Sequence, residues 1–489
     1  MSNAKTSNRS VLYYINSVFF LLIPIVFFQL PPIEPLTDVG TKLVGVFLAA
    51  LWGWVTIGLI WPSIYVLCCL AFTGYYQGFG AVCSDSFGDS TTVLLIFMLA
   101  FAGLIEKSGV GKAISVWFVT RKIVKGRPWV LCFAFLFSVY ILGSMTSGTP
   151  SVLLGWSLLT GICTAVGYKA GDPLAKFLFF GVLVAGPLGM DLFPFKPVSM
   201  VALSVYTNMT GLEMNYAEYI ACALMLDSLI MIGYLLFGKF VLKLDVSKMK
   251  DFDPEKLNAR KVLQLSIEQK IILILTAILL IAFIVPSFLP DQWLVTRIFT
   301  TLGTTGTIMI VMVFLIMLKI KGVPLCNFQE MAKNGIAWDA IMLTSAVLPI
   351  TGALADDKAS GFITFITDLV GPMVEGKPEI LFVLLFMIIA TIFTNFCTNA
   401  GTASSLSPIA IAGAGLVGAN PALLIVFVIK CCHFAYFTPA ASPATALAIA
   451  QPEWISQKEM LKYGLAVITI AFIVVVVIGI PIGSLIFSI

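Results

Sequence analysis

Long runs of apolar residues constrain the fold of this chain more than any other feature. Residues 271–289 and 464–487 each exceed the roughly 18 residues that a helix needs to cross a bilayer. Of the 489 residues, 59% are hydrophobic and 11% are charged, and a water-soluble domain could not bury that much apolar surface. The composition predicts an all-α polytopic membrane protein, because helices satisfy their backbone hydrogen bonds within the hydrocarbon.

The apolar runs divide into about eleven predicted transmembrane helices and two longer segments. The first run follows Lys5 and Arg9 like a signal peptide, but it is long and lacks a small-residue cleavage site, so we expect a retained span. The predicted spans cover residues 11–30, 43–60, 62–76, 91–106, 174–209, 217–241, 271–289, 298–318, 336–354, 421–449 and 464–487.

The two longer segments, residues 128–168 and 377–418, each carry a hydroxyl-rich motif midway. The first contains Met-Thr-Ser-Gly-Thr-Pro-Ser from Met145, and the second contains Thr-Asn-Ala-Gly-Thr-Ala-Ser from Thr398. Such residues are costly in hydrocarbon unless their backbone lines a polar cavity. We therefore expect two re-entrant hairpins, each of which enters and leaves the membrane on one side. Paired interruptions of this kind indicate the binding site of a transporter with inverted repeats.

The distribution of Lys and Arg predicts the orientation, because cytoplasmic loops carry the excess of basic residues. With a cytoplasmic N-terminus, most of the 29 basic residues fall on the inner side. The predicted outer side holds only Lys42, Arg297, Lys358 and Lys377. One hairpin then enters from each face, which predicts an inverted repeat in a multi-pass plasma-membrane protein.

The domain organisation follows from this repeat. We expect scaffold spans in residues 1–90, a first repeat in 91–242, a cytoplasmic linker in 243–270, further scaffold spans in 271–335 and a second repeat in 336–489.

Two predicted spans, residues 174–209 and 421–449, contain a proline that breaks the helix. The sequences are Phe-Lys-Pro-Val-Ser around Lys196 and Ala-Ser-Pro-Ala-Thr around Ser442. The N-termini of half-helices favour anions, and the carbonyls at C-termini favour cations. We expect one central site for an anion and a coupling ion, although such residues also permit simple kinks or close helix packing.

The second half resembles the divalent-anion/sodium symporter family, which carries di- and tricarboxylates or sulfate. The matching residues are Thr398-Asn399-Ala400-Gly401-Thr402 with Pro408, and the run from Ala435 to Pro443. The resemblance implies a homodimer in which a transport domain moves like an elevator against a scaffold. With the broken spans it implies substrate contacts at Thr146, Ser147, Gly148, Thr149, Lys196, Pro197, Thr398, Asn399, Ala400, Thr402, Ser442 and Pro443.

Coupling residues are expected at Thr398, Asn399, Ala441, Asp191 and His433, with sodium near Asn399. The first half departs from the family, since Met145 and Thr146 stand where the family has Ser and Asn. Lys196 is an intramembrane charge, which suggests a function. Its ammonium could replace a sodium ion and bind substrate, or it could pair with Asp191. His433 and Lys430 could relay protons or simply pack.

We therefore predict a secondary active transporter of succinate-, malate- or citrate-like anions, either sodium-coupled or an anion exchanger. Sulfate or another inorganic anion, and sodium/proton antiport, are the alternatives within the same superfamily. A channel is also considered. An enzyme is not expected, because the chain lacks the H-E-x-x-H, Walker and C-x-x-C motifs. The expected partners are a small organic anion, membrane lipid and a second copy, with no nucleic acid and no cofactor other than sodium.

Overall fold

The computed structural model describes residues 11–253, 262–290, 292–320, 322–374, 377–439 and 441–487. Lys5, Arg9 and residues 254–261 of the predicted linker lie outside this part. The described chain is helical apart from a two-stranded antiparallel hairpin, β1 (Lys319–Ile320) and β2 (Val323–Pro324). The predicted all-α membrane fold is confirmed.

The helices of the first half are α1 (Val11–Phe27), α2 (Asp38–Thr56), α3 (Ile60–Leu70), α4 (Phe79–Ser86), α5 (Ser90–Ser108), α6 (Val110–Val119), α7 (Pro128–Met145), α8 (Gly148–Val166), α9 (Pro173–Met190), α10 (Pro197–Thr210) and α11 (Tyr216–Leu236). Those of the second half are α13 (Ile267–Ile284), α14 (Leu294–Met317), α15 (Phe328–Asn334), α16 (Trp338–Ala355), α17 (Asp357–Ser360), α18 (Phe362–Val374), α19 (Glu379–Thr394), α20 (Asn399–Val417), α21 (Pro421–Cys432), α22 (Pro443–Ile449), α23 (Gln457–Val474) and α24 (Ile480–Ile486).

Among the described residues, eleven helical segments are long and apolar enough to cross a membrane. This set includes the hairpin helices α7, α8 and α20, so re-entry from one side stays a prediction. The span predicted at residues 62–76 is wrong, because α3 ends at Leu70 and Gly74 follows with a positive φ of 87°. A helix of 11 residues extends only about 16 Å, which is too short to cross a bilayer.

The order of helices is repeated in the two halves. In the first half, α5 is followed by the short helix α6, the hairpin α7–α8, the broken pair α9–α10, and α11. In the second, α16 is followed by α17 and α18, the hairpin α19–α20, the broken pair α21–α22, and α23. Both hydroxyl-rich motifs lie at the turns of the hairpins. The sequence prediction of two helical hairpins and two broken helices in corresponding positions is therefore correct.

The two breaks have the same local cause. Residues 191–196 separate α9 from α10, and residues 433–442 separate α21 from α22. Each second half-helix begins with proline at its first position, Pro197 or Pro443. Proline lacks a backbone N–H and is favoured at the start of a helix rather than in its middle.

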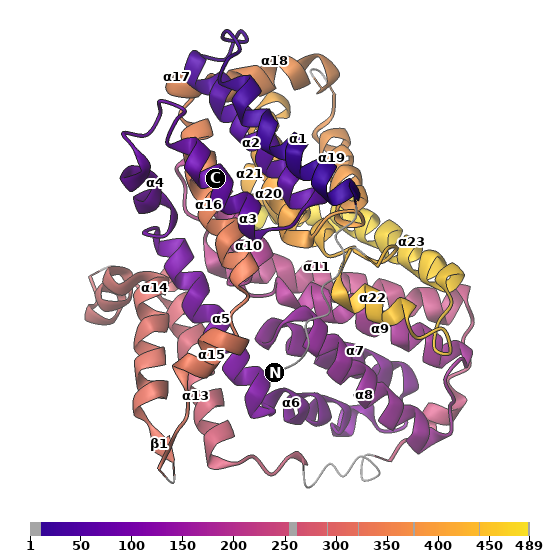
Figure 1. Cartoon of the computed structure of the whole chain (residues 1–489). Helices are drawn as coiled ribbons and strands as arrows, with labels where there is room; N and C mark the ends of the chain where they lie inside the picture. Colours follow the sequence, from indigo (N-terminus) through magenta and orange to yellow (C-terminus); the bar gives the residue numbers. More distant parts are fainter. Residues whose placement is uncertain are drawn as a thin grey trace.

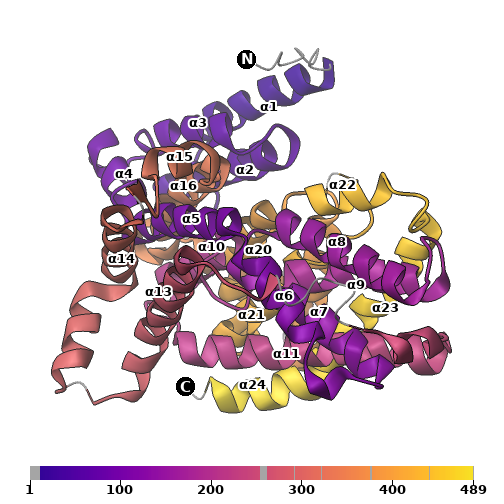
Figure 2. The ribbon, with the colours of Figure 1, turned by 90° about the horizontal axis from the view of Figure 1, so that it is seen from below.

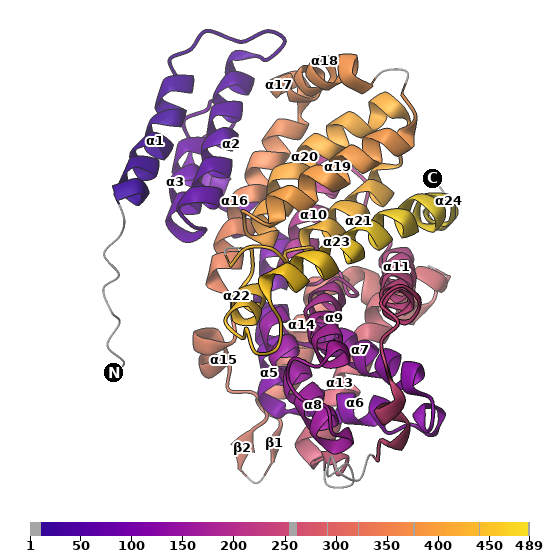
Figure 3. The same cartoon turned by 90° about the vertical axis from the view of Figure 1, so that its right-hand side faces the viewer.

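Helix α10 lies at the centre and packs against α5, α16, α20 and α21 (Figure 1). Helices α1, α2 and α3 form a separate layer beside α16, which is clearest in Figure 3. Helices α13 and α14 project as a pair from the other helices (Figure 2), and α14 packs along α5. Helix α22 of the second repeat lies against α8 and α9 of the first. The two repeats are thus interleaved around α10.

Candidate functional site

A cavity of about 730 Å³ opens where α5, the turn of the first hairpin, the start of α10 and the segment from α15 to α16 meet. Its polar lining comes from five ionisable or hydroxyl side chains and an amide, namely Glu106, Lys107, Ser147, Lys196, Glu330 and Asn334. The volume falls within the roughly 300–1,000 Å³ of small-molecule pockets. Three of the predicted substrate residues, Ser147, Lys196 and Pro197, line this cavity.

Lys196 directly precedes α10 and lines the cavity. Its side chain is only 5% exposed, and its Nζ donates a hydrogen bond of 2.8 Å to the carbonyl oxygen of Thr146 in the hairpin turn. An ammonium group has three N–H donors, and this is the one hydrogen bond that the described residues supply to it. The carboxylate of Glu106 lines the same cavity, and the two remaining N–H donors of Lys196 are available to an anionic group that enters it.

The pairing of Lys196 with Asp191, which the sequence left open, does not form. Both residues flank the same break, but Lys196 turns to the hairpin carbonyl. Asp191 instead contacts His433 of the second repeat, with 2.6 Å between Oδ2 and Nε2. The two charged residues at the ends of this break therefore have different partners: Lys196 contacts the first hairpin, and Asp191 contacts the second repeat.

Ser147 is the N-cap residue of α8, yet its side chain makes no capping hydrogen bond to that helix. Its Oγ donates to Oε2 of Glu106 at 3.3 Å. The first amides of α8 carry the positive end of the helix dipole. Gly148 follows, and a Cβ there would lie 2.6 Å from the sulfur of Met190, so the turn packs tightly on the end of α9. The hairpin turn thus offers a hydroxyl and a helix N-terminus to the cavity.

The other charges at the cavity neutralise each other. Lys107 Nζ lies 2.7 Å from both carboxylate oxygens of Glu330. This contact joins α5 to α15 at the cavity wall. With that pair balanced, Lys196 and Glu106 are the two lining charges left to act on a bound molecule.

A second polar cluster lies between the two repeats, where Asp191 and His433 are buried and Asn399 is half-buried. His433 Nδ1 lies 3.2 Å from Asn399 Nδ2, and its Nε2 lies 2.6 Å from Asp191 Oδ2. The other Asp191 oxygen accepts a hydrogen bond of 3.0 Å from Ser199. His433 thus faces the Asn399 amide with one ring nitrogen and the Asp191 carboxylate with the other. The cluster joins three of the predicted coupling residues.

The remaining predicted residues of the second half mostly satisfy local backbone groups. Thr398 Oγ1 accepts from the amide of Gly401, and Thr402 Oγ1 donates to the Thr398 carbonyl. Ser442 Oγ accepts from the amide of Thr445, and Pro443 begins α22. Ala400 is half-buried and Ala441 is buried. In the first half, Thr146 is buried and Thr149 lies in the first turn of α8.

A third buried contact joins Lys430 of α21 to Asp227 of α11, with 2.8 Å between Nζ and Oδ2. Tyr140 of α7 donates to the same carboxylate oxygen at 2.9 Å. The exposed fractions are 2% for the Lys430 side chain and 0% for that of Asp227. The ammonium of Lys430 therefore contacts Asp227 and not His433. This contact supports a packing role for Lys430 better than a proton relay with His433.

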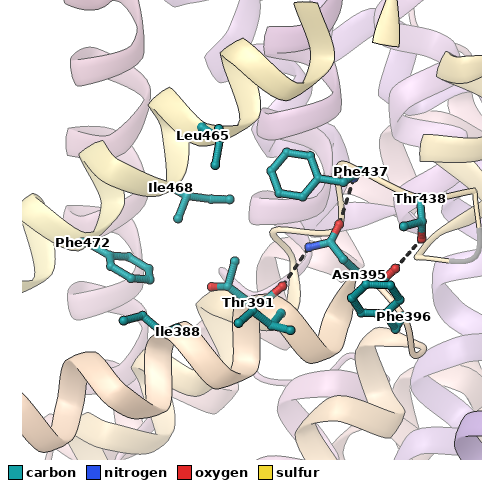
Figure 4. A pocket seen from close by; sticks show the side chains of 10 residues that line it. Ile388, Thr391, Asn395, Phe396, Phe437, Thr438, Leu465, Ile468 and Phe472 are labelled. Atoms are coloured by element: carbon teal, nitrogen blue, oxygen red, sulfur yellow. Dashed lines mark hydrogen bonds between the residues drawn. The ribbon is translucent and has the colours of Figure 1, made fainter. Parts of the chain in front are cut away.

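Asn395 organises the second break (Figure 4). Its Oδ1 accepts from the amides of Tyr436 and Phe437, and its Nδ2 donates to the carbonyls of Thr391 and Phe434. The adjoining cavity of about 260 Å³ is lined mainly by apolar side chains of α19 and α23, among them Ile388 and Phe472. This second cavity has no charged side chain among the described residues that line it, so it is not suited to an anion.

Sequence reasoning missed Glu106, Lys107, Glu330 and Asn334 of the anion cavity, as well as Asn395. Glu106 and Lys107 follow an apolar run in the way that ordinary interfacial residues do. Asn395 carried a usable signal, because an amide within an apolar helix near the motif needs several buried partners. The contacts of Glu330 depend on packing between distant segments, which no local pattern reveals.

Residues 12–489 match the model of a family described as the sodium:sulfate symporter transmembrane region. The chain belongs to this family. It is therefore a multi-pass membrane transporter of a sodium-coupled divalent-anion family and not an enzyme.

Several transporters are similar to this chain at low sequence identity. A sodium-dependent dicarboxylate transporter of Staphylococcus saprophyticus is 22% identical over 357 residues, covering 70% of this chain and 67% of the relative. An uncharacterised transporter of Escherichia coli is 29% identical over 156 residues, which is 32% of this chain and 25% of the relative. The crystal structure of the YdaH transporter of Alcanivorax borkumensis is similar with a TM-score of 0.56 and 16% identity, over 96% of this chain and 98% of that one. That likeness shows the fold.

Proposed function

We propose that this protein is a secondary active transporter of small di- or tricarboxylate anions, and that Lys196 binds a substrate carboxylate. The observation that carries the proposal is the buried ammonium of Lys196, which lines a 730 Å³ cavity and uses one hydrogen bond on Thr146. Charge-assisted hydrogen bonds to carboxylates are short and strong. The turn of the first hairpin adds the Ser147 hydroxyl and the N-terminus of α8.

The size of the cavity supports an organic anion over sulfate. A volume of about 730 Å³ suits a molecule of several carbon atoms, whereas a bare inorganic anion would leave most of it filled with water. The dicarboxylate transporter of Staphylococcus saprophyticus among the relatives agrees with this choice. Inorganic anions remain an outcome of the test below.

Lys196 also bears on the coupling ion. In broken-helix transporters, carbonyls of unwound segments coordinate sodium, and here the ammonium of Lys196 occupies the carbonyl of Thr146. We propose that this fixed cation takes the place of one sodium ion. Near Asn399, the amide nitrogen faces His433 and the amide oxygen accepts from Thr394. An amide oxygen has two lone pairs, so Asn399 can still coordinate a sodium ion, and the uptake test below distinguishes sodium symport from anion exchange.

The arrangement of the helices fits the expected elevator movement. We propose that the hairpins and the broken helices form the transport domain, and that the layer of α1 to α3 with α13 and α14 forms the scaffold of a homodimer. The proposed scaffold has exposed apolar residues, such as Ile274 with an exposed fraction of 59% and Val313 with 60%. Such residues suit contact with lipid or with a second copy of the chain. The N-terminus is proposed to be cytoplasmic.

The test is uptake of radiolabelled succinate and citrate into proteoliposomes, with or without a sodium gradient and with or without unlabelled dicarboxylate inside. Uptake that requires internal substrate and ignores sodium supports exchange, whereas sodium-driven uptake places a coupling ion in the protein. Sulfate uptake, or sodium/proton antiport in the absence of carboxylates, would overturn the proposed substrate.

The matched variants are Lys196→Ala, Lys196→Arg and Lys112→Ala. Lys112 is an exposed lysine on α6 in the same repeat, so its loss controls for a general change of charge. A hydrogen bond to a charged group contributes about 1.5–3 kcal/mol, so Lys196→Ala should weaken uptake by on the order of 10- to 100-fold. Equal uptake by Lys196→Ala and Lys112→Ala would refute the role of Lys196.

A further inference from the structure

The anion cavity contains a carboxylate as well as an ammonium, which is unexpected for a site that binds dianions. Glu106 and Lys196 both line it. Both side chains contact the turn of the first hairpin. Glu106 accepts a hydrogen bond from Ser147 Oγ, and Lys196 donates one to the carbonyl of the preceding residue, Thr146. Consecutive Cα atoms are only about 3.8 Å apart. A small molecule at this turn therefore meets both charges.

We propose that Glu106 selects substrates that carry a hydrogen-bond donor close to a carboxylate, such as a 2-hydroxy dicarboxylate. This inference rests on the proposed function, since it concerns the specificity of the same cavity. Lys196 binds the carboxylate, and the ionised Glu106 accepts a hydrogen bond from the neighbouring hydroxyl. A dicarboxylate without a donor places only acceptor oxygens near Glu106, where two anionic groups repel each other.

The geometry around Glu106 supports this role. Its hydrogen bond from Ser147 is long, at 3.3 Å, and bonds of this length are weak, so a substrate hydroxyl can share or replace it. An ionised carboxylate accepts hydrogen bonds and donates none, so it cannot bind a second substrate carboxylate directly. Glu330, the other acid of the cavity, is already held by Lys107 through both of its oxygens.

Glu330 therefore provides a matched control for Glu106. Both acids line the same cavity, and each can be changed to glutamine with little change of volume. Only Glu106 has an oxygen directed at the hydroxyl of the hairpin turn. A loss of negative charge from the cavity is common to both variants, whereas a change of substrate preference is expected only for Glu106→Gln.

The first experiment uses the unmodified protein in proteoliposomes. Unlabelled malate, aspartate and succinate compete with radiolabelled succinate, and the donor-bearing malate should inhibit at a concentration several-fold lower than succinate. Malate and aspartate carry a hydroxyl and an ammonium at the same carbon, so their comparison identifies the favoured donor. Equal inhibition by all three compounds would overturn the inference without affecting the proposed dicarboxylate transport.

The second experiment compares KM for malate and succinate in three proteins. In Glu106→Gln the KM for succinate should fall, because the repulsion is removed, and the several-fold preference for malate should shrink toward unity. Glu330→Gln frees the ammonium of Lys107, so the KM values for malate and succinate should both fall while their ratio matches that of the unmodified protein. An unchanged preference for malate in a folded Glu106→Gln protein would contradict the role of Glu106. Absence of carboxylate uptake by the unmodified protein would instead contradict the proposed function.

Discussion

Asp191 and His433 lie in contact at the ends of the first halves of the two broken helices. Asp191 is the C-cap residue of α9, His433 is the C-cap residue of α21, and 2.6 Å separates the carboxylate oxygen from the imidazole nitrogen. Both side chains are 0% exposed in this pair. The contact therefore joins equivalent points of the two repeats and fixes the position of one break relative to the other.

Replacement of His433 by alanine should destabilise the protein strongly. The buried carboxylate of Asp191 would keep only the Ser199 hydroxyl, and a buried polar group that loses its partner costs about 1–3 kcal/mol, or more when it is charged. Thermal unfolding of the purified variant in detergent should show a lower midpoint. Asp191→Asn combined with His433→Ala should recover part of the loss, because no buried charge is then left alone. An unchanged midpoint for His433→Ala would contradict this account.

The pair of Lys430 and Asp227 is expected to serve structure rather than transport. Lys430→Met alone leaves a buried carboxylate with Tyr140 as its donor, which should cost about 3–5 kcal/mol. Lys430→Met with Asp227→Asn should restore most of the stability and much of the uptake. A stable double variant without uptake would show that Lys430 takes part in transport directly.

The first hairpin and α9 should not tolerate a side chain where their backbones meet. A Cβ on Gly189 would lie 1.9 Å from the carbonyl oxygen of Tyr140, and one on Gly143 would lie 2.0 Å from that of Gly186. Gly189→Ala must therefore push α7 away from α9 and should lower both uptake and the unfolding midpoint. Gly415 in α20 is the control, because a Cβ on that residue would meet no atom within 4 Å. Gly415→Ala should stabilise by about 0.5–1 kcal/mol through helix propensity.

Asn395 should be essential for the unwound segment after α21. Asn395→Ala removes the acceptor for two amides and the donor for the Phe434 carbonyl, and each buried group left unpaired costs about 1–3 kcal/mol. We expect a sharp loss of uptake and of thermal stability. Phe396, which is 67% exposed, offers an adjacent control, since Phe396→Ala should have little effect on either measurement. Similar results for the two variants would argue against the role of Asn395.

The sequence was sufficient for features with a local cause. Pro197 and Pro443 marked the starts of the two second half-helices, and the hydroxyl-rich motifs marked the turns of the two hairpins. The end of α3 was missed, because the apolar run continues past Leu70 while glycine at position 74 with positive φ ends the helical path. Hydrophobicity alone does not distinguish such a turn from a longer span.

The candidate site was only partly predictable, because its charges come from distant segments. Lys196 was found as a buried charge in an apolar run. The pairing with Asp191 was one of two alternatives for Lys196, and it does not form, since five residues of separation in an unwound segment do not bring the two side chains together. The contact of Asp191 with His433 and that of Lys107 with Glu330 depend on the packing of the two halves. Periodicity and spacing carry no information about such pairs.

Asp191 and His433 occupy equivalent positions of the two repeats and contact each other. This pairing of unlike residues depends on both repeats being in one chain. In a symmetric dimer of two identical repeats, a residue on the two-fold axis meets its own copy, so Asp191 would face a second aspartate or His433 a second histidine. Fusion of the repeats into one chain removes that restriction. An acid of one half can then face a base of the other, as Asp191 and His433 do, which two identical repeats could not provide.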